Sequence, residues 1–525
     1  MPESSPLHPW SLTRLTPPWD ETRSIYWQIL DHPEKSDLPD EERDPEKLRF
    51  AAGAFDGVIG HHTAKGEDAN HAATTLVRLL EALIHTPSQE HLSDLYRTVI
   101  ESSALQLADE FQNQATDRLL PRYADRVAET GRYFASGADR REAVKFGILL
   151  LGIAGDSSDA PLLKTLGSHD EFTLFSAVAL WNLSDDPELV LWELAQQVHG
   201  WGRIQIVERL HQTENREIQA WMLREGFRNS VMDEYLAATC ARTGKLHEAL
   251  RALSIDRALL DGAAELLSAL VNGGPADDID DYEHGPEVLE SYLRHLEQTP
   301  DAGLSHLLAV ADILSFLSER DDESWQKRLE RGWNQNLREQ LITQCRTIMA
   351  RPTWRPKIEE GLKKQDRWPF AQAEMAARAL GIDTWDVLFD RVRKSPMTES
   401  WFELMRQTGE SRIDSVLAFA ISILDEQSIG AGPSETLGLG PHYAPHHVLD
   451  QLLQELPRFP GRGWDLIRTG LTSPVTRNRN MALNALIAWP REVWPADSFP
   501  LLKRAHSLEP NADLKQRMGE AIGQE

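Results

Sequence analysis

The chain has 525 residues, enough for several compact domains or for one elongated repeat array with a substantial core. Its 55 Lys and Arg against 82 Asp and Glu leave a formal net charge of −27, which repels nucleic-acid phosphates and anionic lipid headgroups. We therefore expect neither a nucleic acid nor a membrane as partner. The acidity favours solubility, and it also suits a partner protein with a basic surface.

The two cysteines, Cys240 and Cys345, lie in helical patterns without a CxxC motif or a His at metal-ligand spacing. Disulfides are therefore not expected. The N-terminus lacks an apolar core of signal-peptide length, and no run of about eighteen apolar residues occurs. These features predict a cytoplasmic protein, which we expect to be a monomer.

The first 140 residues divide into an irregular segment and a helical module. Residues 1–45 are rich in Pro and charge, with an apolar island at residues 25–30 that can form a short docking helix. From residue 46 the apolar residues recur with the helical period. Residues 46–140 are therefore predicted to be a helical N-terminal module, with helices over 47–59, 68–85, 90–119 and 121–135.

A polar segment between the first two of these helices contains three histidines and two carboxylates: His61, His62, His71, Glu67 and Asp68. It has neither an HEXXH nor an HXH signature, so a metal site is not expected there. The segment is interpreted as an interhelix loop in which Asp68 or Asn70 caps the next helix.

Residues 141–272 have the most regular pattern, in which helices of about a dozen residues alternate with short turns. One repeat unit, residues 159–183, reads DAPLLKTLGSHDEFTLFSAVALWNL. Pro161 suits a helix first turn, Gly167 ends the first helix and Asp170 can cap the second. Neither helix can bury its apolar stripe alone, so the unit requires neighbours on both sides.

This unit resembles a HEAT repeat of the armadillo type, whose second helix usually reads Val-Arg, then Ala three residues later, then Ala-Leu after three more. The matching positions are Phe172-Thr173, Ser176 and Ala179-Leu180, then Arg203, Ile206 and Arg209-Leu210, and most closely Arg479, Ala482 and Ala485-Leu486. Residues 235–250 also resemble a single tetratricopeptide unit. The resemblance implies an all-α superhelix, a HEAT-like solenoid of stacked antiparallel helix pairs, in which the family arginine hydrogen-bonds within the stack.

Sixteen tryptophans are a high count for a chain of this length. Trp181 and Trp192 occupy helix-stripe positions, so we expect them in the core. Trp201 lies in a turn between Gly200 and Gly202. The sequence allows its ring either to pack on a helix end or to be exposed to a partner.

Two segments interrupt the helical pattern of the remaining chain. Residues 273–286 form an acidic loop without EF-hand spacing, which is predicted to be a solvated insertion or a docking loop for a basic partner. Helical repeats resume over residues 287–426. Residues 427–447 form a loop rich in Gly, Pro and His, and no carboxylate is interleaved with its histidines to make a metal site. Residues 448–525 are predicted to be C-terminal HEAT-like repeats and a cap.

Nucleotide-binding and serine-hydrolase motifs are absent: no GxGxxG, GxxxxGK[ST] or GxSxG occurs. We therefore expect no cofactor and assign no catalytic residue. The first hypothesis is a non-enzymatic protein-binding scaffold or adaptor, including an inhibitor or immunity-type binder of a basic protein. The alternative is a hydrolase or DNA-glycosylase-like enzyme whose scattered acids and histidines meet on the concave face.

The recognition surface is expected on one side of the central repeats, at Trp201, Arg203, Arg224, Arg228 and Asp233. A candidate lid is formed by His442, His446 and His447. Trp201 and Arg203 lie at a helix start, and Trp and Arg often dominate the binding energy of interfaces. In the alternative interpretation these arginines and acids pair with one another and with helix ends to brace the stack.

Overall fold

The computed structural model describes residues 10–33, 37–40, 49–56, 67–320 and 322–523. Over these residues the regular secondary structure is helical, with one isolated bridge between Thr436 and Val475. The predicted all-α fold of stacked helix pairs is confirmed. The chain divides into two compact units, built mainly from Phe50–Trp354 and Arg355–Glu525, and each is described by itself.

The helices of the first unit are α1 (Ile25–Asp31), α3 (Glu67–His85), α4 (Gln89–Ile100), α5 (Ala104–Arg118), α6 (Leu120–Gly137), α7 (Arg141–Ala154), α8 (Ala160–Gly167), α9 (Asp170–Leu183), α10 (Pro187–Ala195), α11 (Trp201–Arg209), α12 (Arg216–Trp221), α13 (Glu234–Thr243), α14 (Leu246–Arg251), α15 (Arg257–Asn272), α16 (Gly285–Glu297), α17 (Leu304–Leu317), α18 (Asp322–Glu330) and α19 (Gln335–Met349). A short π-helical turn, Met222–Gly226, extends α12.

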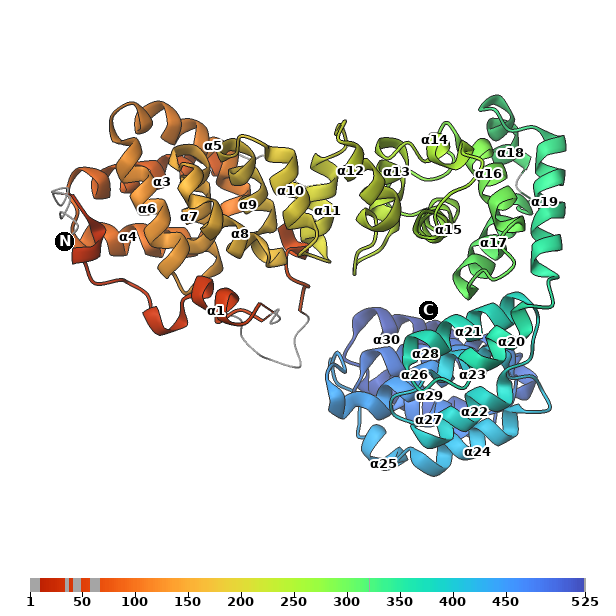
Figure 1. Cartoon of the computed structure of the whole chain (residues 1–525). Coiled ribbons are helices and arrows are strands. Elements are labelled where there is room, and N and C mark those ends of the chain that lie inside the picture. The colour runs from red at the N-terminus through yellow and green to blue at the C-terminus, as the bar shows by residue number, and fades with distance from the viewer. Residues whose placement is uncertain (1–9, 34–36, 41–48, 57–66, 321, 524–525) are drawn as a thin grey trace. The chain divides into compact units, whose positions relative to one another are not determined.

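A ladder of alternate helices runs through this unit (Figure 1). Helices α7, α9, α11, α13, α15, α17 and α19 each pack on the next member of the series. Because alternate helices run in the same direction, the turns that precede them lie along one edge. We call this the turn edge and define it by residues 138–140, 168–169, 196–200, 227–233 and 252–256. A hydrogen bond of 2.6 Å from Ser230 N to His199 O links two of these turns.

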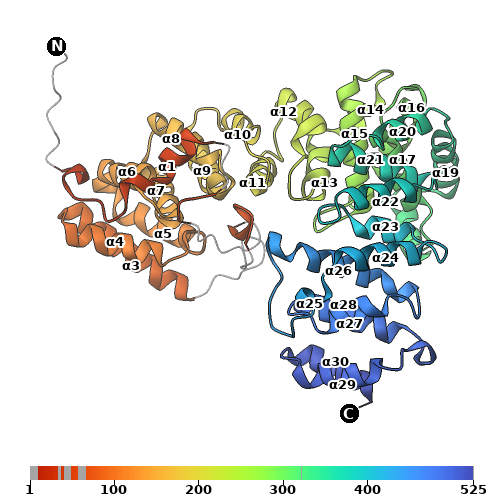
Figure 2. The same cartoon turned by 90° about the horizontal axis from the view of Figure 1, so that it is seen from below.

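The second unit comprises α20 (Trp354–Gly361), α21 (Arg367–Ala379), α22 (Trp385–Lys394), α23 (Trp401–Gln407), α24 (Ile413–Ile423), α25 (Glu426–Ile429), α26 (Ala444–Glu455), α27 (Trp464–Leu471), α28 (Thr476–Ala488), α29 (Ser498–Leu508) and α30 (Ala512–Ile522). Figure 2 shows α26 and α28 side by side, and α29 with α30 at the end of this unit. Its core is continuous from Phe370 to Ile522.

The repeat unit predicted at residues 159–183 forms the pair α8 and α9. Pro161 occupies the first turn of α8, and Gly167 ends that helix. A side chain at Gly167 would lie 2.8 Å from the Ser176 side chain, so glycine allows the two helices to approach closely. The apolar stripe of this pair is buried, as two stacked helices require.

The arginine position of the repeat binds the turn that precedes its helix. Arg479 is fully buried, donates to Ser473 O at 2.9 Å and Pro474 O at 3.0 Å, and pairs with Glu509 at 2.7 Å. Thr173, which stands where the family prefers arginine, donates to Gly167 O at 2.8 Å. The hydrogen bonding within the stack that the resemblance implies is therefore present at both positions.

Two helix predictions for the N-terminal module were wrong. The helix expected over residues 90–119 is divided into α4 and α5, where Glu142 Oε2 accepts from Ala104 N at 2.7 Å and caps the start of α5. The helix expected over 47–59 is absent from residues 49–53, although residues 54–56 are helical. The rest of that expected helix lies outside the described residues.

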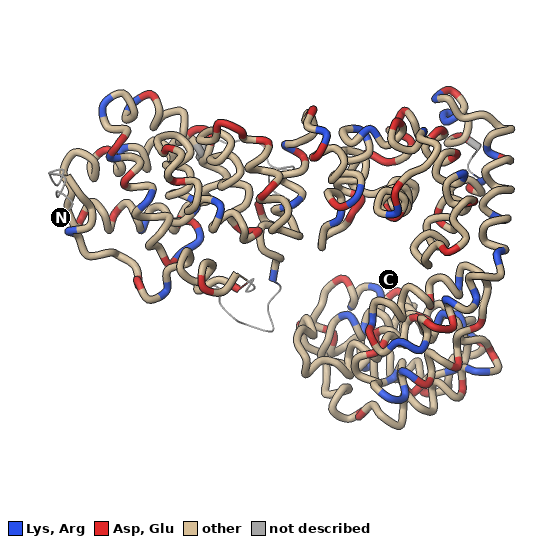
Figure 3. Tube along the Cα trace, viewed as in Figure 1, with Lys and Arg blue, Asp and Glu red and all other residues tan. Residues whose placement is uncertain are grey.

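Charged residues of both signs are spread along the described helices. Basic and acidic residues alternate along both units without a basic stripe (Figure 3). Among the described helices, none combines the length and the apolar character that crossing a membrane requires.

Candidate functional site

Trp201 and Arg203 lie at the start of α11, directly after the turn of residues 196–200, and neither is accessible. Each side chain is only 7% exposed. The Trp201 ring packs against Tyr235 at 5.3 Å. The Arg203 guanidinium donates to the carbonyl groups of Ala195 and Val198 at 3.0 and 2.9 Å. The expectation that these two side chains reach a partner is corrected: they brace the stack.

Arg224 lies in the π-helical turn that extends α12, Arg228 and Asp233 lie in the turn that follows, and all three are partly buried. Arg224 pairs with Asp256 at 2.5 Å, and Arg228 pairs with Glu265 at 2.5 Å. Asp233 accepts from Asn229 N at 3.0 Å, and burial raises its pKa. The two arginine pairs join neighbouring repeats, whereas the Asp233 bond lies within one turn.

The three histidines of the predicted lid belong to the second unit and differ in burial. His446 is 7% exposed, whereas His442 and His447 are exposed. His447 Nε2 lies 2.7 Å from Gly438 O. His446 is therefore corrected from a binding residue to a buried structural one, and no contact assigns a lid function to the other two.

His446 belongs to a buried polar network, which we call the His446 network and define as His446, Asp450, Ser473 and Asn478. His446 Nδ1 lies 3.1 Å from Ser473 Oγ and 2.7 Å from Asn478 Oδ1. Asn478 Nδ2 donates to Asp450 Oδ1 at 2.6 Å. The network holds the turn at residues 472–475, to which Gly432 N and the Thr436 bridge attach the loop.

The His446 network brings Ser, His and Asp together, but it is not arranged for nucleophilic catalysis. Ser473 is fully buried, and its hydroxyl donates to Asn478 Oδ1 at 2.8 Å. The Ser473 hydroxyl oxygen also accepts a hydrogen bond from Val475 N at 3.1 Å. Asp450 hydrogen-bonds Asn478 rather than orienting the imidazole, so the triad relationship is missing.

The principal charged site of the first unit was not predicted. We call it the Lys145 cluster and define it by six side chains: Asp40, Asp56, Arg141, Glu142, Lys145 and Glu171. Lys145 Nζ lies 2.6 Å from Asp56 Oδ2, 2.8 Å from Glu171 Oε1 and 3.5 Å from Glu142 Oε1. The Lys145 side chain is 3% exposed, so three carboxylates compensate one buried cation.

The pKa shifts follow from this arrangement. Burial lowers the pKa of Lys145, but the surrounding carboxylates outweigh burial and raise it above the ordinary value. Burial raises the pKa of Asp56 despite the neighbouring ammonium group. Lys145 and Arg141 hold the pKa of Glu171 below its usual range, although burial acts in the opposite direction. Of Asp56, Glu171 and Lys145, only Asp56 has a pKa shifted toward its neutral form, so its charge is the least favourable in the folded state.

The Lys145 cluster fastens residues 50–56 to the turn edge. Besides the Asp56 pair, Gly53 N donates to Glu171 Oε2 at 3.1 Å. Gly53 has a φ of +71°, and a side chain there would lie 2.5 Å from Asp170 O and 3.3 Å from Trp201 Cβ. Asp170 accepts from Gly202 N at 2.6 Å, which ties α9 to the start of α11. Residues 50–56 thus cover part of the surface predicted around Trp201.

Two phenylalanines project from this segment. Phe50 is 72% exposed and Phe55 is 51% exposed. Their rings meet in a T-shaped contact with centroids 6.5 Å apart. The sequence offered one signal for the site beneath them: Lys145 interrupts an apolar helical stripe, REAVKFGILLLG, and a buried lysine requires carboxylates. Nothing in the local pattern indicated which carboxylates these are.

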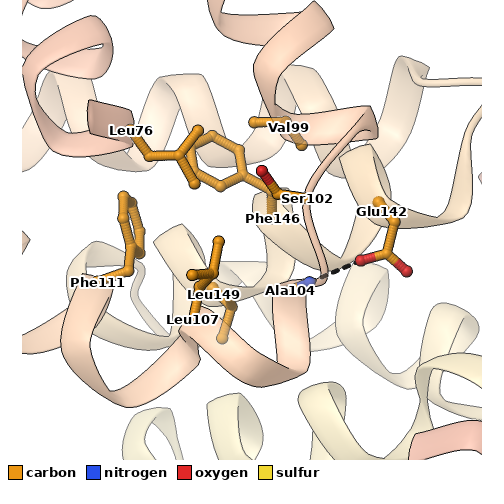
Figure 4. A pocket seen from close by; sticks show the side chains of 9 residues that line it. All are labelled: Leu76, Val99, Ser102, Ala104, Leu107, Phe111, Glu142, Phe146 and Leu149. Atoms are coloured by element: carbon orange, nitrogen blue, oxygen red, sulfur yellow. Dashed lines mark hydrogen bonds between the residues drawn. The ribbon is translucent and has the colours of Figure 1, made fainter. Parts of the chain in front are cut away.

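A small apolar cavity lies beside Glu142, between α3, α4, α5 and α7 (Figure 4). It is lined by Leu76, Val99, Ser102, Ala104, Leu107, Phe111, Glu142, Phe146 and Leu149. Its free volume of about 10 Å³ is at the limit for one water molecule. The Glu142 carboxylate is used by Ala104 N and Lys145. This cavity does not provide a substrate site.

The other candidate regions are also committed to internal contacts. Among the residues that the structure describes, no three His, Cys, Asp or Glu side chains are placed to hold a metal ion. His61 and His62 lie outside the described residues. The acidic loop is not a free insertion, because Ile279 and Tyr282 are buried and Asp280 pairs with Arg328 at 2.7 Å.

The tryptophan prediction was wrong for one residue. Trp181 is 41% exposed rather than buried, because the packed face of α9 is formed by Phe172, Phe175 and Leu180. Trp192 is partly buried and meets Trp221 at a ring distance of 6.4 Å.

Comparison with known proteins adds little to this description. No family model matches the chain. No curated protein sequence matches it. The crystal structure of an engineered protein is 14% identical, covers 86% of this chain and 98% of that chain, and has a TM-score of 0.25. A likeness of that size carries no argument about fold or function.

Proposed function

We propose that the protein is a non-enzymatic, HEAT-like binding scaffold or adaptor whose turn edge recognises another protein. The supporting observation is a contrast between buried and exposed groups. The polar clusters that chemistry would require are hydrogen-bonded within the stack, whereas large apolar side chains are exposed on the turn edge and on residues 50–56, which are fastened to it. These are Phe50, Phe55, Val231, Met232 and Leu253, from 36% to 97% exposed. Other apolar side chains, such as Trp368 and Phe499, are exposed elsewhere, but the Phe50 and Phe55 rings contact each other, and grouped exposed apolar side chains are typical of interaction surfaces.

The charge of the chain supports a basic partner. A net charge of −27 attracts a positively charged protein and accelerates encounter, with a range of about 8 Å at physiological ionic strength. The same charge opposes nucleic acids, which argues against the DNA-glycosylase alternative. An inhibitor or immunity-type binder of a basic protein fits this combination. We propose a cytoplasmic monomer that binds one such protein.

An enzyme remains the second candidate, because the His446 network and the Lys145 cluster concentrate titratable groups. Both are satisfied internally and lack an accessible nucleophile, which favours a structural role for each. A hydrolase would need a third, different site among residues that are scattered in sequence.

Affinity purification of the tagged full-length chain, followed by mass spectrometry, tests the proposal. We expect a stable basic protein to copurify, and its association rate to fall as salt concentration rises. A retained metal ion or nucleotide with no protein partner would instead favour the enzyme. An acidic partner bound equally fast at high salt would contradict the electrostatic argument.

A further inference from the structure

Residues 50–56 are held firmly but contribute little to the core. Ala54 is the apolar side chain that they bury, with 7% exposure, while Phe50 and Phe55 remain mostly outside. Burial of one alanine stabilises a segment weakly, by less than about 1 kcal/mol. Hydrophobic burial therefore does not explain why this segment lies where it does.

Neutralisation of Lys145 does not explain the segment either. Without Asp56, Lys145 would keep Glu171 at 2.8 Å and Glu142 at 3.5 Å. A buried ion pair adds little net stability, because desolvation offsets the attraction, but it fixes geometry. The pair between Asp56 and Lys145 is therefore best understood as a device that positions residues 50–56.

The anchors constrain the segment at two points. Asp56 is held 2.6 Å from Lys145 Nζ, and Gly53 N is held 3.1 Å from Glu171 Oε2. The backbone at Gly53 lies too close to Asp170 O for any side chain. Phe50 precedes both anchors in sequence and Phe55 lies between them, so their paired rings are presented in a defined place.

The charged groups that hold residues 50–56 are largely buried. Five carboxylates and two cations gather there: Asp40, Asp56, Glu142, Asp170, Glu171, Arg141 and Lys145. These groups are used within the stack and hold the segment, whereas it is the net charge of −27 that favours a partner with a basic surface. The following turn of the same edge adds exposed Val231 and Met232.

We propose that Phe50 and Phe55 are the aromatic anchors by which the turn edge docks into an apolar pocket, rimmed by Lys and Arg, on a basic partner protein. The Lys145 cluster positions these anchors, and Lys145 and Asp56 are positioning residues rather than contacts. This inference rests on the proposed scaffold function and adds the contact residues. Aromatic side chains in a pocket are typical anchors of protein interfaces.

The first experiment measures binding of the purified copurifying protein to the full-length chain and its variants. In the double variant Phe50→Ala and Phe55→Ala we expect Kd to rise by about 30-fold, as for loss of an interface anchor. Thermal unfolding should stay unchanged, because both rings are exposed. Trp368→Ala is the matched control, since Trp368 is 71% exposed and belongs to the second unit. A Kd within about threefold of the parent for the double variant would overturn the proposal.

The second experiment tests positioning while leaving both rings in place. Asp56→Ala removes the anchor, so hydrogen exchange within residues 50–56 should accelerate and Kd should rise about tenfold. Asp56→Asn retains an oxygen that accepts from Lys145, and it should restore both measurements. Faster exchange in Asp56→Ala with unchanged Kd would show that the cluster does not position the anchors for binding.

The outcomes separate this inference from the function on which it rests. If the chain binds its basic partner and the double variant binds equally well, the scaffold function stands and the assignment of the anchors is wrong. If sedimentation instead shows a dimer that the double variant abolishes, a second copy is the occupant and the basic partner is wrong. If the chain is a monomer and no protein copurifies, both proposals fail.

Discussion

The Lys145 cluster of the first unit and the His446 network of the second unit differ in chemistry, although each holds a segment that lies outside the stacked helix pairs. The cluster joins charged groups, with Lys145 Nζ 2.6 Å from Asp56 and 2.8 Å from Glu171. The network is mainly neutral and centres on Asn478, which donates to His446 O at 2.9 Å and to Asp450. The stability of the charged cluster depends on how well its positive and negative charges compensate one another. The stability of the neutral network depends on its individual hydrogen bonds.

This difference predicts unequal sensitivity to single substitutions. Removing the one buried cation from the cluster leaves several carboxylates without compensation. Removing one member of the network leaves individual hydrogen-bonding groups unsatisfied, and each of these is less unfavourable than a buried charge. The predictions below test this contrast from the largest expected effect to the smallest.

Lys145→Met should give the largest loss of stability. Asp56, Glu142 and Glu171 would remain together without the ammonium group, and removing one partner of a buried ion pair destabilises by about 3 to 5 kcal/mol. Urea titration monitored by hydrogen exchange should show the loss in the first unit alone. Adding Asp56→Asn and Glu171→Gln to the variant should recover most of it. A loss below about 1 kcal/mol would show that the cluster is not the charged core inferred from its distances.

Asn478→Ala should destabilise the second unit by about 1 to 3 kcal/mol. The substitution leaves His446, Asp450 and Ser473 without their shared partner in a fully buried place. Exchange protection should fall first at the turn of residues 472–475 and at the loop that bridges to it. Asn484→Ala, a partly buried asparagine of the same helix, is the control. Equal effects of the two variants would refute a specific role of the network.

The pH response should distinguish Asp56 from Glu171 within the cluster. The folded pKa of Asp56 is raised, so its favourable contribution is present below its ordinary pKa of 3.8 and is lost as pH rises through the raised value. The folded pKa of Glu171 is lowered, so its contribution is present above its ordinary pKa of 4.5 and is lost as pH falls through the lowered value. The two contributions therefore act in opposite directions.

The raised pKa of Asp56 predicts the effect of the substitution Asp56→Asn. At pH 7 it should keep or raise the stability of the first unit, by up to about 1 kcal/mol, because a neutral amide avoids the burial of an ionised carboxylate. Denaturation at pH 4 and pH 7 should show a smaller advantage at pH 4, where the parent Asp56 takes up a proton. A clear loss of stability at pH 7 would mean that the Asp56 charge is favourable in the folded state.

The sequence predicted much of this architecture because helix pairs repeat locally. Gly167, Pro161 and the apolar stripe of residues 159–183 specify a helix–turn–helix without reference to the rest of the chain. The arginine position at Arg479 was likewise visible in its motif. The turns between regular helices could be counted along the sequence for the same reason.

The site itself could not be predicted in full, because burial on that edge depends on distant segments. Trp201 is covered by Tyr235 and by residues 50–56, and the local sequence VHGWGR predicts neither contact. The position of Lys145 in an apolar helical stripe indicated a buried cation, but its partner Asp56 is 89 residues away in sequence. Pairings at such separations follow from folding and not from local periodicity.

Trp181→Ala should have the smallest effect on stability. It also tests whether helical periodicity alone can predict which residues are buried. Its helix stripe predicted a core residue, but the side chain is 41% exposed, so the substitution removes less packing than a core deletion. We expect a loss below about 1 kcal/mol, against about 3 to 5 kcal/mol for Trp401→Ala, whose side chain is fully buried in the second unit. Chemical denaturation of both variants, resolved by unit, gives the comparison. A loss above about 2 kcal/mol for Trp181→Ala would place that residue in the core, as its position in the sequence first indicated.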